Sequence, residues 1–200
     1  ARTYELNFNE NNEFHQIASD GGFLEESVKM NVVSLAPAER AEILLDLSDY
    51  NVGDKITLRD ANYNLMTINI VEDNNKDIDI PKKLVEIDDY NKDEIVRSRE
   101  FVMSGMGQMV TINGKQMNMD RIDEKLNLNE LEEWVIRNES SGMGMMHSTP
   151  HPFHVHGAQF QVIERDGGAP PLNERGWKDT VMVDNGEEVK ILAKFRKKGL

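Results

Sequence analysis

Polar and hydrophobic positions alternate along this chain in short runs, which is typical of strands with one buried face. Asp, Asn, Gly and Pro residues separate the runs at near-regular spacing. In the first 71 residues the expected strands are 3–8, 14–18, 31–35, 41–47, 55–58 and 65–71. Many short strands bounded by turn residues predict a β-sandwich or barrel.

The same pattern returns over residues 99–200, with few signs of helical periodicity. The expected strands are 99–103, 110–112, 116–119, 130–137, 152–156, 159–165, 180–183 and 189–195. Asn113-Gly114 lies between two of them and is a strong signal for a two-residue hairpin turn. Residues 166–168 and 184–186 also have turn composition. The sequence therefore predicts an all-β protein.

A charge-rich segment, residues 72–98, separates the two blocks of strands. It carries nine acidic and five basic residues with little apolar pattern, which is typical of linkers or solvated surface. We therefore expect one β unit over residues 1–71, a charged linker over 72–98 and a second β unit over 99–200.

Composition limits the classes of function. The formal net charge is −13, which disfavours nucleic acid as a partner and favours cations. Ordinary solubility explains the same charge. No apolar run reaches the ~20 residues of a membrane span. Cysteine is absent, which excludes disulfides and thiolate metal ligands within these 200 residues.

Three of the five histidines lie within six positions, His151, His154 and His156. On an extended strand, side chains at i and i+2 share a face and those at i and i+3 do not. His154 and His156 should therefore point together, and His151 should point away. Neutral imidazole suits copper, zinc, iron and nickel. The spacing predicts metal binding, with two imidazoles at one centre and a third at another; the isolated His15 is expected to be structural.

Residues 151–163 (HPFHVHGAQFQVI) resemble the first copper-ligand motif in the last domain of multicopper oxidases. Residues 176–181 (GWKDTV) resemble the next landmark of that family. Residues 17–22 (IASDGG) and 35–42 (LAPAERAE) are similar to signatures of its middle domain. The subgroup resembled is that of bacterial laccase-like oxidases, which includes spore-coat laccases and cuprous oxidases. Only the C-terminal portion of the family pattern is covered.

The resemblance implies cupredoxin-like Greek-key β-sandwiches, both incomplete: the later part of a middle domain and a final domain without its last strands. It implies that His151 is a ligand of a type 1 copper, His154 of a type 2 copper and His156 of a type 3 copper. A His-Cys-His segment and a further N-terminal domain would supply the remaining ligands. The activity implied is one-electron oxidation of phenols or metal ions coupled to reduction of dioxygen to water, which these 200 residues are not expected to complete alone.

Other side chains are weaker candidates. Asp179, in the GWKDTV motif, is expected either to orient a ligand imidazole through its second ring nitrogen or to form an ion pair in a turn. Eleven methionines occur, and thioethers bind Cu(I), whereas flexible core filling is their more common use. The candidate Cu(I) contacts immediately before His151 are Met143, Met145, Met146 and His147.

Two rival functions remain. One is a copper-free cupredoxin-type structural or interaction module, which the absent cysteine leaves open. The other is a simple His-ligated metal protein such as a jelly-roll dioxygenase, which the lack of any histidine after His156 disfavours. The expected partners are the remaining N-terminal and C-terminal parts of the same protein and, through exposed sheet edges, a second copy. The resemblance favours an extracytoplasmic or cell- or spore-surface location.

Overall fold

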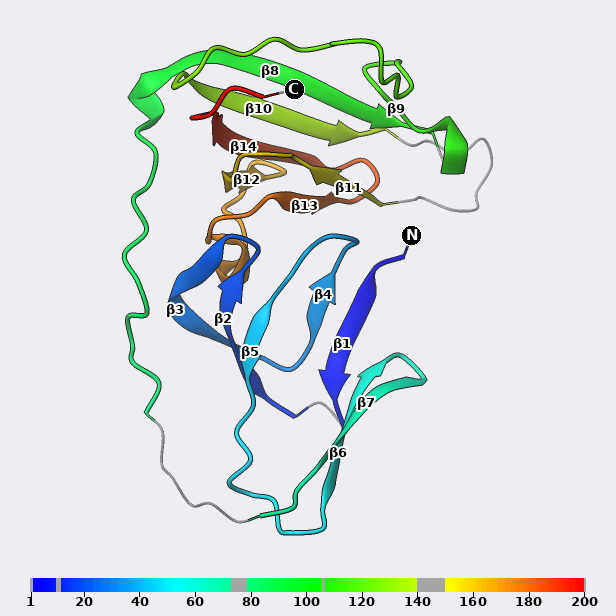
Figure 1. Cartoon of the computed structure of the whole chain (residues 1–200), viewed down its shortest axis with the longest axis vertical. Coiled ribbons are helices and arrows are strands. Elements are labelled where there is room, and N and C mark those ends of the chain that lie inside the picture. The colour runs from blue at the N-terminus through cyan, green and yellow to red at the C-terminus, as the bar shows by residue number, and fades with distance from the viewer. Residues whose placement is uncertain (1, 10–11, 73–78, 106, 140–149, 200) are drawn as a thin grey trace.

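The computed structural model describes residues 2–9, 12–72, 79–105, 107–139 and 150–199 (Figure 1). Strands dominate these residues, so the predicted all-β class is confirmed. The helices among them are three short 3-10 turns, η1 (Lys92–Glu94), η2 (Gly107–Met109) and η3 (Leu172–Glu174). No helix in these ranges is long and apolar enough to span a bilayer.

The first seven strands form what we call the first sandwich. They are β1 (Tyr4–Phe8), β2 (Phe14–Ser19), β3 (Gly22–Met30), β4 (Val33–Leu35), β5 (Glu42–Leu44), β6 (Lys55–Asp60) and β7 (Tyr63–Asn69). One sheet has the order β4-β1-β6-β7 and the other β3-β2-β5. Phe8 and Phe14 pack edge to face between them, with ring centroids 5.8 Å apart. Their alternation with polar neighbours explains why these strands keep one buried face.

The remaining seven strands form the second sandwich. They are β8 (Ile95–Ser104), β9 (Thr111–Ile112), β10 (Leu131–Asn138), β11 (His151–His154), β12 (Phe160–Arg165), β13 (Thr180–Val183) and β14 (Glu188–Lys194). One sheet has the order β12-β14-β10-β8-β9, in which β8 and β10 are parallel. The other pairs β11 with β13 in antiparallel register.

An aromatic cluster anchors β11 to this sandwich. Phe153 lies in sequence between His151 and His154, and its side chain is buried. Its ring lies 5.5 Å from that of Phe101 and 6.2 Å from that of Trp134. Burial of one such ring is worth about 2–3 kcal/mol before the cost of ordering is counted. The core therefore fixes the strand that carries the histidines.

Three local expectations need correction. β3 was not predicted, because its sequence GFLEESVKM has only weak alternation. Asn113 and Gly114 do adopt the left-handed φ values of a tight hairpin turn, 51° and 72°, but residues 116–119 form no strand. Their methionines, Met117 and Met119, are more than 80% exposed, so no apolar face holds them against the sheet. β11 ends at His154 and not at residue 156.

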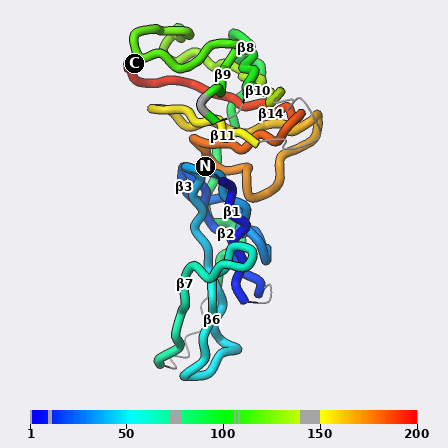
Figure 2. Tube along the Cα trace, turned by 90° about the vertical axis from the view of Figure 1, so that its right-hand side faces the viewer, coloured from blue at the N-terminus to red at the C-terminus, as the bar shows by residue number. Residues whose placement is uncertain are grey.

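The two sandwiches stack along the long axis (Figures 1 and 2), and residues 79–94 run along one side of them (Figure 1). This segment bonds to both. The amide of Leu84 donates to the carbonyl oxygen of Glu25 (2.7 Å) in the first sandwich. Gln161 of the second accepts from the amide of Tyr90 (3.0 Å) and donates to the carbonyl oxygen of Asp88 (3.0 Å). β8 begins at Ile95, within the segment 72–98 expected to be the linker.

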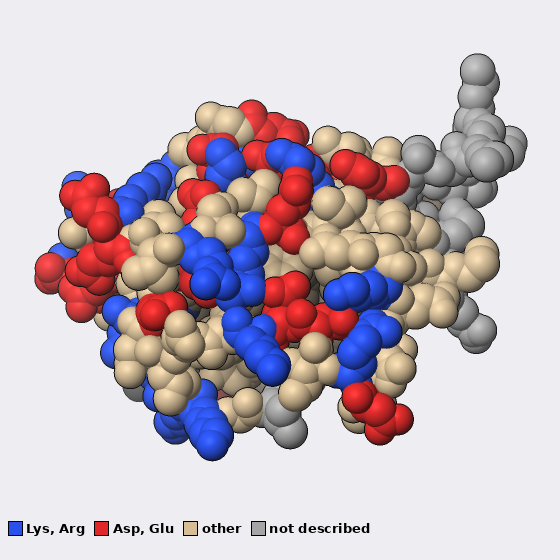
Figure 3. Space-filling view, turned by 90° about the horizontal axis from the view of Figure 1, so that it is seen from above, with Lys and Arg blue, Asp and Glu red and all other residues tan. Residues whose placement is uncertain are grey.

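Acidic and basic side chains are interspersed over the end of the molecule formed by the second sandwich (Figure 3). Several are paired there, including Arg137 with Glu188 at 2.6 Å and Lys190 with Glu164 at 2.6 Å. On this face the net negative charge is thus dispersed, as expected for ordinary solubility.

Candidate metal centre

The three histidines of the motif lie on or just after β11, but their surroundings differ. His151 and His154 are the ends of the strand and pair with Val183 and Thr180 of β13. His151 is buried, whereas His154 and His156 are exposed. One backbone hydrogen bond follows the end of β11, since the amide of Val155 donates to the carbonyl oxygen of Asp179 (2.9 Å).

The surroundings of His154 define which ring nitrogen carries its proton. Nδ1 lies 2.9 Å from the carbonyl oxygen of Asp179, an atom that can only accept a hydrogen bond. It also lies 2.8 Å from the hydroxyl oxygen of Thr180, which itself donates to the carboxylate of Asp179 (3.0 Å). Nδ1 must therefore be the donor. The neutral ring then has its lone pair on Nε2, the form that binds a metal.

His154 and His156 lie against one another, with ring centroids 4.7 Å apart and ring planes inclined by 67°. Both line an open depression of about 530 Å³, together with residues 157–159 and Asp179. In the described part of the chain no group of three or more His, Cys, Asp and Glu side chains is arranged to hold a metal ion. Two imidazoles at one location are suited to metal binding, which residues outside this pair would have to complete.

His151 does not line this depression. Its Nε2 lies 3.0 Å from the carbonyl oxygen of Gly105, in the loop that follows β8. The motif thus presents two imidazoles to one location and one to another, which is the grouping that strand alternation predicts.

Asp179 acts on His154 mainly through its backbone. Its carboxylate oxygen Oδ1 is 3.6 Å from Nδ1, beyond a good hydrogen bond, whereas its carbonyl oxygen is at 2.9 Å. Both carboxylate oxygens accept from Arg40, at 2.7 Å each. Arg40, with a smaller contribution from the Thr180 hydroxyl, holds the pKa of Asp179 below its usual value. Asp179 is therefore an ionised partner of Arg40 as well as a neighbour of the ring.

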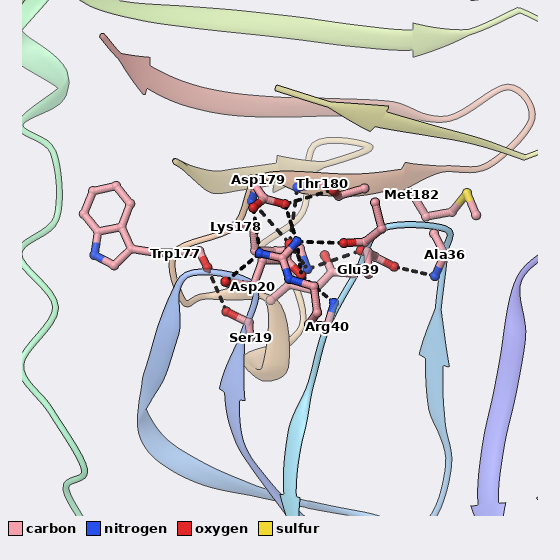
Figure 4. Close-up of polar contacts among 12 residues, drawn as sticks. Ser19, Asp20, Ala36, Glu39, Arg40, Trp177, Lys178, Asp179, Thr180 and Met182 are labelled. Carbon is pink, nitrogen blue, oxygen red and sulfur yellow. Dashed lines mark hydrogen bonds and ion pairs between the residues drawn. The ribbon is translucent and has the colours of Figure 1, made fainter. Parts of the chain in front are cut away.

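The ion pair between Arg40 and Asp179 belongs to a larger group that joins the two sandwiches (Figure 4). We call it the interface cluster: Asp20, Glu39, Arg40, Lys178 and Asp179. The buried ammonium of Lys178 lies 3.3 Å from Asp20 and 3.2 Å from Glu39. The fully buried carboxylate of Asp20 accepts from the backbone amides of Arg40 (2.7 Å), Asp179 and Thr180 (3.2 Å each). Buried charges of this kind are tolerated because they are paired and hydrogen-bonded.

Two glycines allow the sandwiches to approach closely beside this cluster. A Cβ atom on Gly21 would lie 2.7 Å from the carbonyl oxygen of Trp177, and one on Gly176 would lie 2.6 Å from the hydroxyl of Ser19. Gly21 also donates its amide to that carbonyl (2.7 Å), and the Ser19 hydroxyl does the same (2.9 Å). At this point the backbones of the two sandwiches are in direct contact, beside the side chains of the interface cluster.

The methionines in the part of the chain that the structure describes do not gather at this site. The candidate Cu(I) contacts Met143, Met145, Met146 and His147 lie outside the described residues. Met103 is buried in the core of the second sandwich, which is the packing use of methionine. Met109, Met117 and Met119 are largely exposed.

Sequence reasoning assigned no role to Arg40, Asp20, Lys178 or Thr180. The first three lie in the segments that carried the family resemblance, and Thr180 follows Asp179 in the last of them. Their presence in the segments that resemble the family is the signal from which a common site could have been predicted. Local patterns contain no further hint, because 139 residues separate Arg40 from Asp179.

Comparisons with known proteins identify the family of this chain. The family model described as multicopper oxidase matches residues 79–200. Multicopper oxidase mco of Staphylococcus haemolyticus is 37% identical over 199 residues, which are 100% of this chain and 41% of that protein. Cell division protein FtsP of Proteus mirabilis is 30% identical over 217 residues (96% and 42%). The crystal structure of a laccase from Pediococcus acidilactici has a TM-score of 0.91 and 39% identity, over 99% of this chain and 42% of that one. The chain thus spans well under half the length of these relatives.

Proposed function

Because this chain belongs to the multicopper oxidase family, we propose that His154 and His156 bind copper in a centre that reduces dioxygen. In this proposal His154 is a ligand of a type 2 copper and His156 of a type 3 copper, while His151 binds a separate type 1 copper that takes electrons from the substrate. The family uses copper. The observation that carries the proposal is the 2.9 Å contact between Nδ1 of His154 and the carbonyl oxygen of Asp179. It assigns the proton to Nδ1 and leaves the Nε2 lone pair on a ring that lines the open depression.

The proposed activity of the protein that contains this chain is oxidation of phenols or metal ions, one electron at a time, with reduction of dioxygen to water. Bound copper would supply the one-electron chemistry. The chain's own residues hold the imidazoles at fixed positions, because β11 is tied to β13 on one side and to the aromatic cluster through Phe153. His151 and His154 are three positions apart on the strand, about 10 Å of extended backbone. The type 1 copper and the dioxygen-reducing centre would therefore keep a constant spacing.

These 200 residues supply three of the proposed ligands and no cysteine, which a blue-copper site needs. We therefore expect the chain to bind copper weakly and to show no oxidase turnover alone, with the other ligands provided by further segments of the same protein. Consumption of dioxygen with a phenolic substrate by this chain, purified free of other segments, would contradict that expectation.

A Cu(II) titration of the purified chain tests the proposal directly. We expect one site whose electron paramagnetic resonance spectrum shows nitrogen coupling, and at least a tenfold loss of affinity in His154→Ala and in His156→Ala. His15→Ala is the matched control, since His15 lies in β2 and its Nδ1 is 3.3 Å from the Ser27 hydroxyl. Equal affinity in all four proteins would overturn the assignment.

A copper-free structural or interaction module is the second candidate. It is supported by the similarity to the cell division proteins FtsP, which reaches 31% identity in Sodalis glossinidius over 98% of this chain. Copper content after purification from a copper-supplied culture separates the two functions. Retention of copper that depends on His154 supports the oxidase, and its absence supports the module.

Self-association is a further part of the proposal. β7 is an edge strand, and its Tyr63, Leu65 and Met66 are 46–64% exposed. Edges of this kind pair readily with another chain. Light scattering should show dimers or larger species that Leu65→Lys reduces; a monomer at high concentration would rule this out.

A further inference from the structure

We propose that Arg40 is a positioning residue for the imidazole of His154, acting from the other sandwich through Asp179 and Thr180. The path has three contacts. Arg40 binds both carboxylate oxygens of Asp179 at 2.7 Å, and Oδ1 of that carboxylate accepts from the Thr180 hydroxyl at 3.0 Å. The hydroxyl oxygen of Thr180 then accepts from Nδ1 of His154 at 2.8 Å. Figure 4 shows Arg40 reaching across to this segment.

The guanidinium is itself held in place by the first sandwich. Its Nη1 donates to the carbonyl oxygen of Ala38 and its Nη2 to that of Asp20, both at 2.7 Å. A bidentate pair between a guanidinium and a carboxylate fixes orientation as well as distance. The position of the Asp179 carboxylate is therefore set by backbone atoms of the first sandwich, although Asp179 belongs to the second.

Arg40 also decides which oxygen atoms the imidazole uses. Oδ1 of Asp179 lies only 3.6 Å from Nδ1 of His154, so a modest rotation would make the carboxylate a direct acceptor of the Nδ1 proton. While Arg40 occupies both carboxylate oxygens, the carboxylate is drawn away from the ring. The proton then goes to the carbonyl oxygen of Asp179 and to the Thr180 hydroxyl. The orientation of the ring follows from this choice.

The backbone of the same segment is fixed by Asp20. This fully buried carboxylate accepts from the amides of Asp179 and Thr180 at 3.2 Å each, and from the amide of Arg40 at 2.7 Å. Asp20 thus holds the backbone amides of the segment, and Arg40 holds the Asp179 carboxylate. The direction of the Nε2 lone pair is thereby coupled to the docking of the two sandwiches.

The experiment uses the whole 200-residue chain with Arg40→Met and Arg40→Lys. Arg121→Met is the matched control, because Arg121 makes a similar two-point pair with Asp123 (2.8 and 2.9 Å) within one loop of the second sandwich. The first readout is the nuclear magnetic resonance signal of Nδ1–H of His154 in the metal-free chain. We expect Arg40→Met to move this signal, Arg40→Lys to move it less, and Arg121→Met to leave it unchanged. An unmoved signal in Arg40→Met would overturn the proposal.

The second readout is Cu(II) affinity, which rests on the proposed function. We expect about a threefold to tenfold weaker affinity in Arg40→Met and no change in Arg121→Met. If the unsubstituted chain binds no Cu(II), the proposed function fails while the resonance readout still decides the role of Arg40.

Thr180→Val separates positioning from a general effect on folding. It removes the hydroxyl oxygen between Asp179 and His154 and leaves the bidentate pair with Arg40 intact. If Arg40 acts along this path, the change in the His154 signal caused by Arg40→Met is smaller in the Thr180→Val background. Additive effects would contradict the path. Arg40→Lys carries the same comparison if Arg40→Met does not fold.

Discussion

Arg99 and Arg40 each bind a carboxylate through two nitrogen atoms, but one pair lies inside the second sandwich and the other joins the two sandwiches. Arg99 also pairs with a second carboxylate, that of Glu124. Arg99 lies 2.5 and 3.0 Å from the oxygens of Glu132, and these side chains are 12% and 2% exposed. Arg40 lies 2.7 Å from both carboxylate oxygens of Asp179, and these side chains are 50% and 19% exposed. The two pairs have similar geometry but different burial, so their contributions to the stability of the fold should differ.

The buried pair contributes chiefly to stability. Burial opposes ionisation of Glu132, but hydrogen bonds from Arg99 and from the indole of Trp134 outweigh it and hold the pKa of Glu132 below 4.5. Breaking a buried pair by removing one partner costs about 3–5 kcal/mol where the other charge is left without compensation. Here Glu124, 37% exposed, still pairs with Arg99 and reduces that cost. A half-exposed pair is worth about 1 kcal/mol or less. The difference suggests that Arg40 matters for orientation more than for stability.

The largest effect is expected from breaking the buried pair. Glu132→Gln should lower the free energy of unfolding by up to about 3 kcal/mol at pH 7, because it leaves only the more exposed Glu124 to balance the charge of Arg99. Denaturant titration measures this. Glu133→Gln is the control, since Glu133 is the next residue of β10 and makes an exposed hydrogen bond with Ser98. We expect the control to change stability by about 0.5 kcal/mol or less; equal losses would contradict the comparison.

Acid should reduce the same difference. A carboxylate whose folded-state pKa is depressed stabilises the fold fully above its unfolded pKa, here near 4.5, and loses this contribution as the pH falls through the folded value. The stability gap between the unsubstituted chain and Glu132→Gln should therefore stay constant between pH 7 and about pH 5 and shrink below about 4.5. Thermal unfolding over a pH series checks this, and a gap that closes between pH 7 and 6 would refute it.

A smaller effect is expected from forcing the two sandwiches apart. In Gly21→Ala the new Cβ would meet backbone and Cβ atoms of Trp177 at 2.6–2.7 Å, which a side-chain rotation cannot relieve. We expect a loss of about 2 kcal/mol, together with a change in the His154 Nδ1–H signal. Gly168→Ala is the matched control, since its Cβ would meet only the Arg165 carbonyl oxygen, at 3.4 Å. If the stability changes but the His154 signal does not, the orientation of the His154 ring does not depend on the docking of the two sandwiches.

The smallest effect is the direct contribution of the exposed pair to stability. Arg40→Met should cost less than about 1 kcal/mol at low salt, and the cost should vanish near 1 M salt, where charges are screened over about 3 Å. The cost of Glu132→Gln should persist under the same conditions. Unfolding curves at two salt concentrations measure both. If the loss of stability in Arg40→Met persists at high salt, the Arg40–Asp179 pair stabilises the fold as a buried pair does, and the comparison with Arg99–Glu132 fails.

The parts of the fold that the sequence predicted are those governed by local chemistry. The run TVMV of β13 is rich in β-branched residues and forms the predicted strand, Thr180–Val183. Asn113 and Gly114 accept positive φ values and form the predicted turn. The spacing of His154 and His156 predicts that they share a location, and their rings lie 4.7 Å apart.

What the sequence did not predict depends on distant partners. β3 is stabilised by pairing with β2 and not by its own weak alternation. Residues 116–119 have strand composition, but no neighbouring strand binds them. Arg40 and Asp179 meet only because two sandwiches dock, and their 139-residue separation has no periodic signature. Such contacts follow from tertiary packing, which overrides local preference.

Gln161 and Glu25 hold residues 84–90 against both sandwiches, so the connecting chain is already folded into the structure that it joins. A loose tether would let each sandwich explore a wide volume and would make every docking event costly in entropy. Attachment at several points confines that search to a small region and raises the local concentration of each surface near the other. We therefore expect Arg40 to meet Asp179 again quickly whenever the two sandwiches separate.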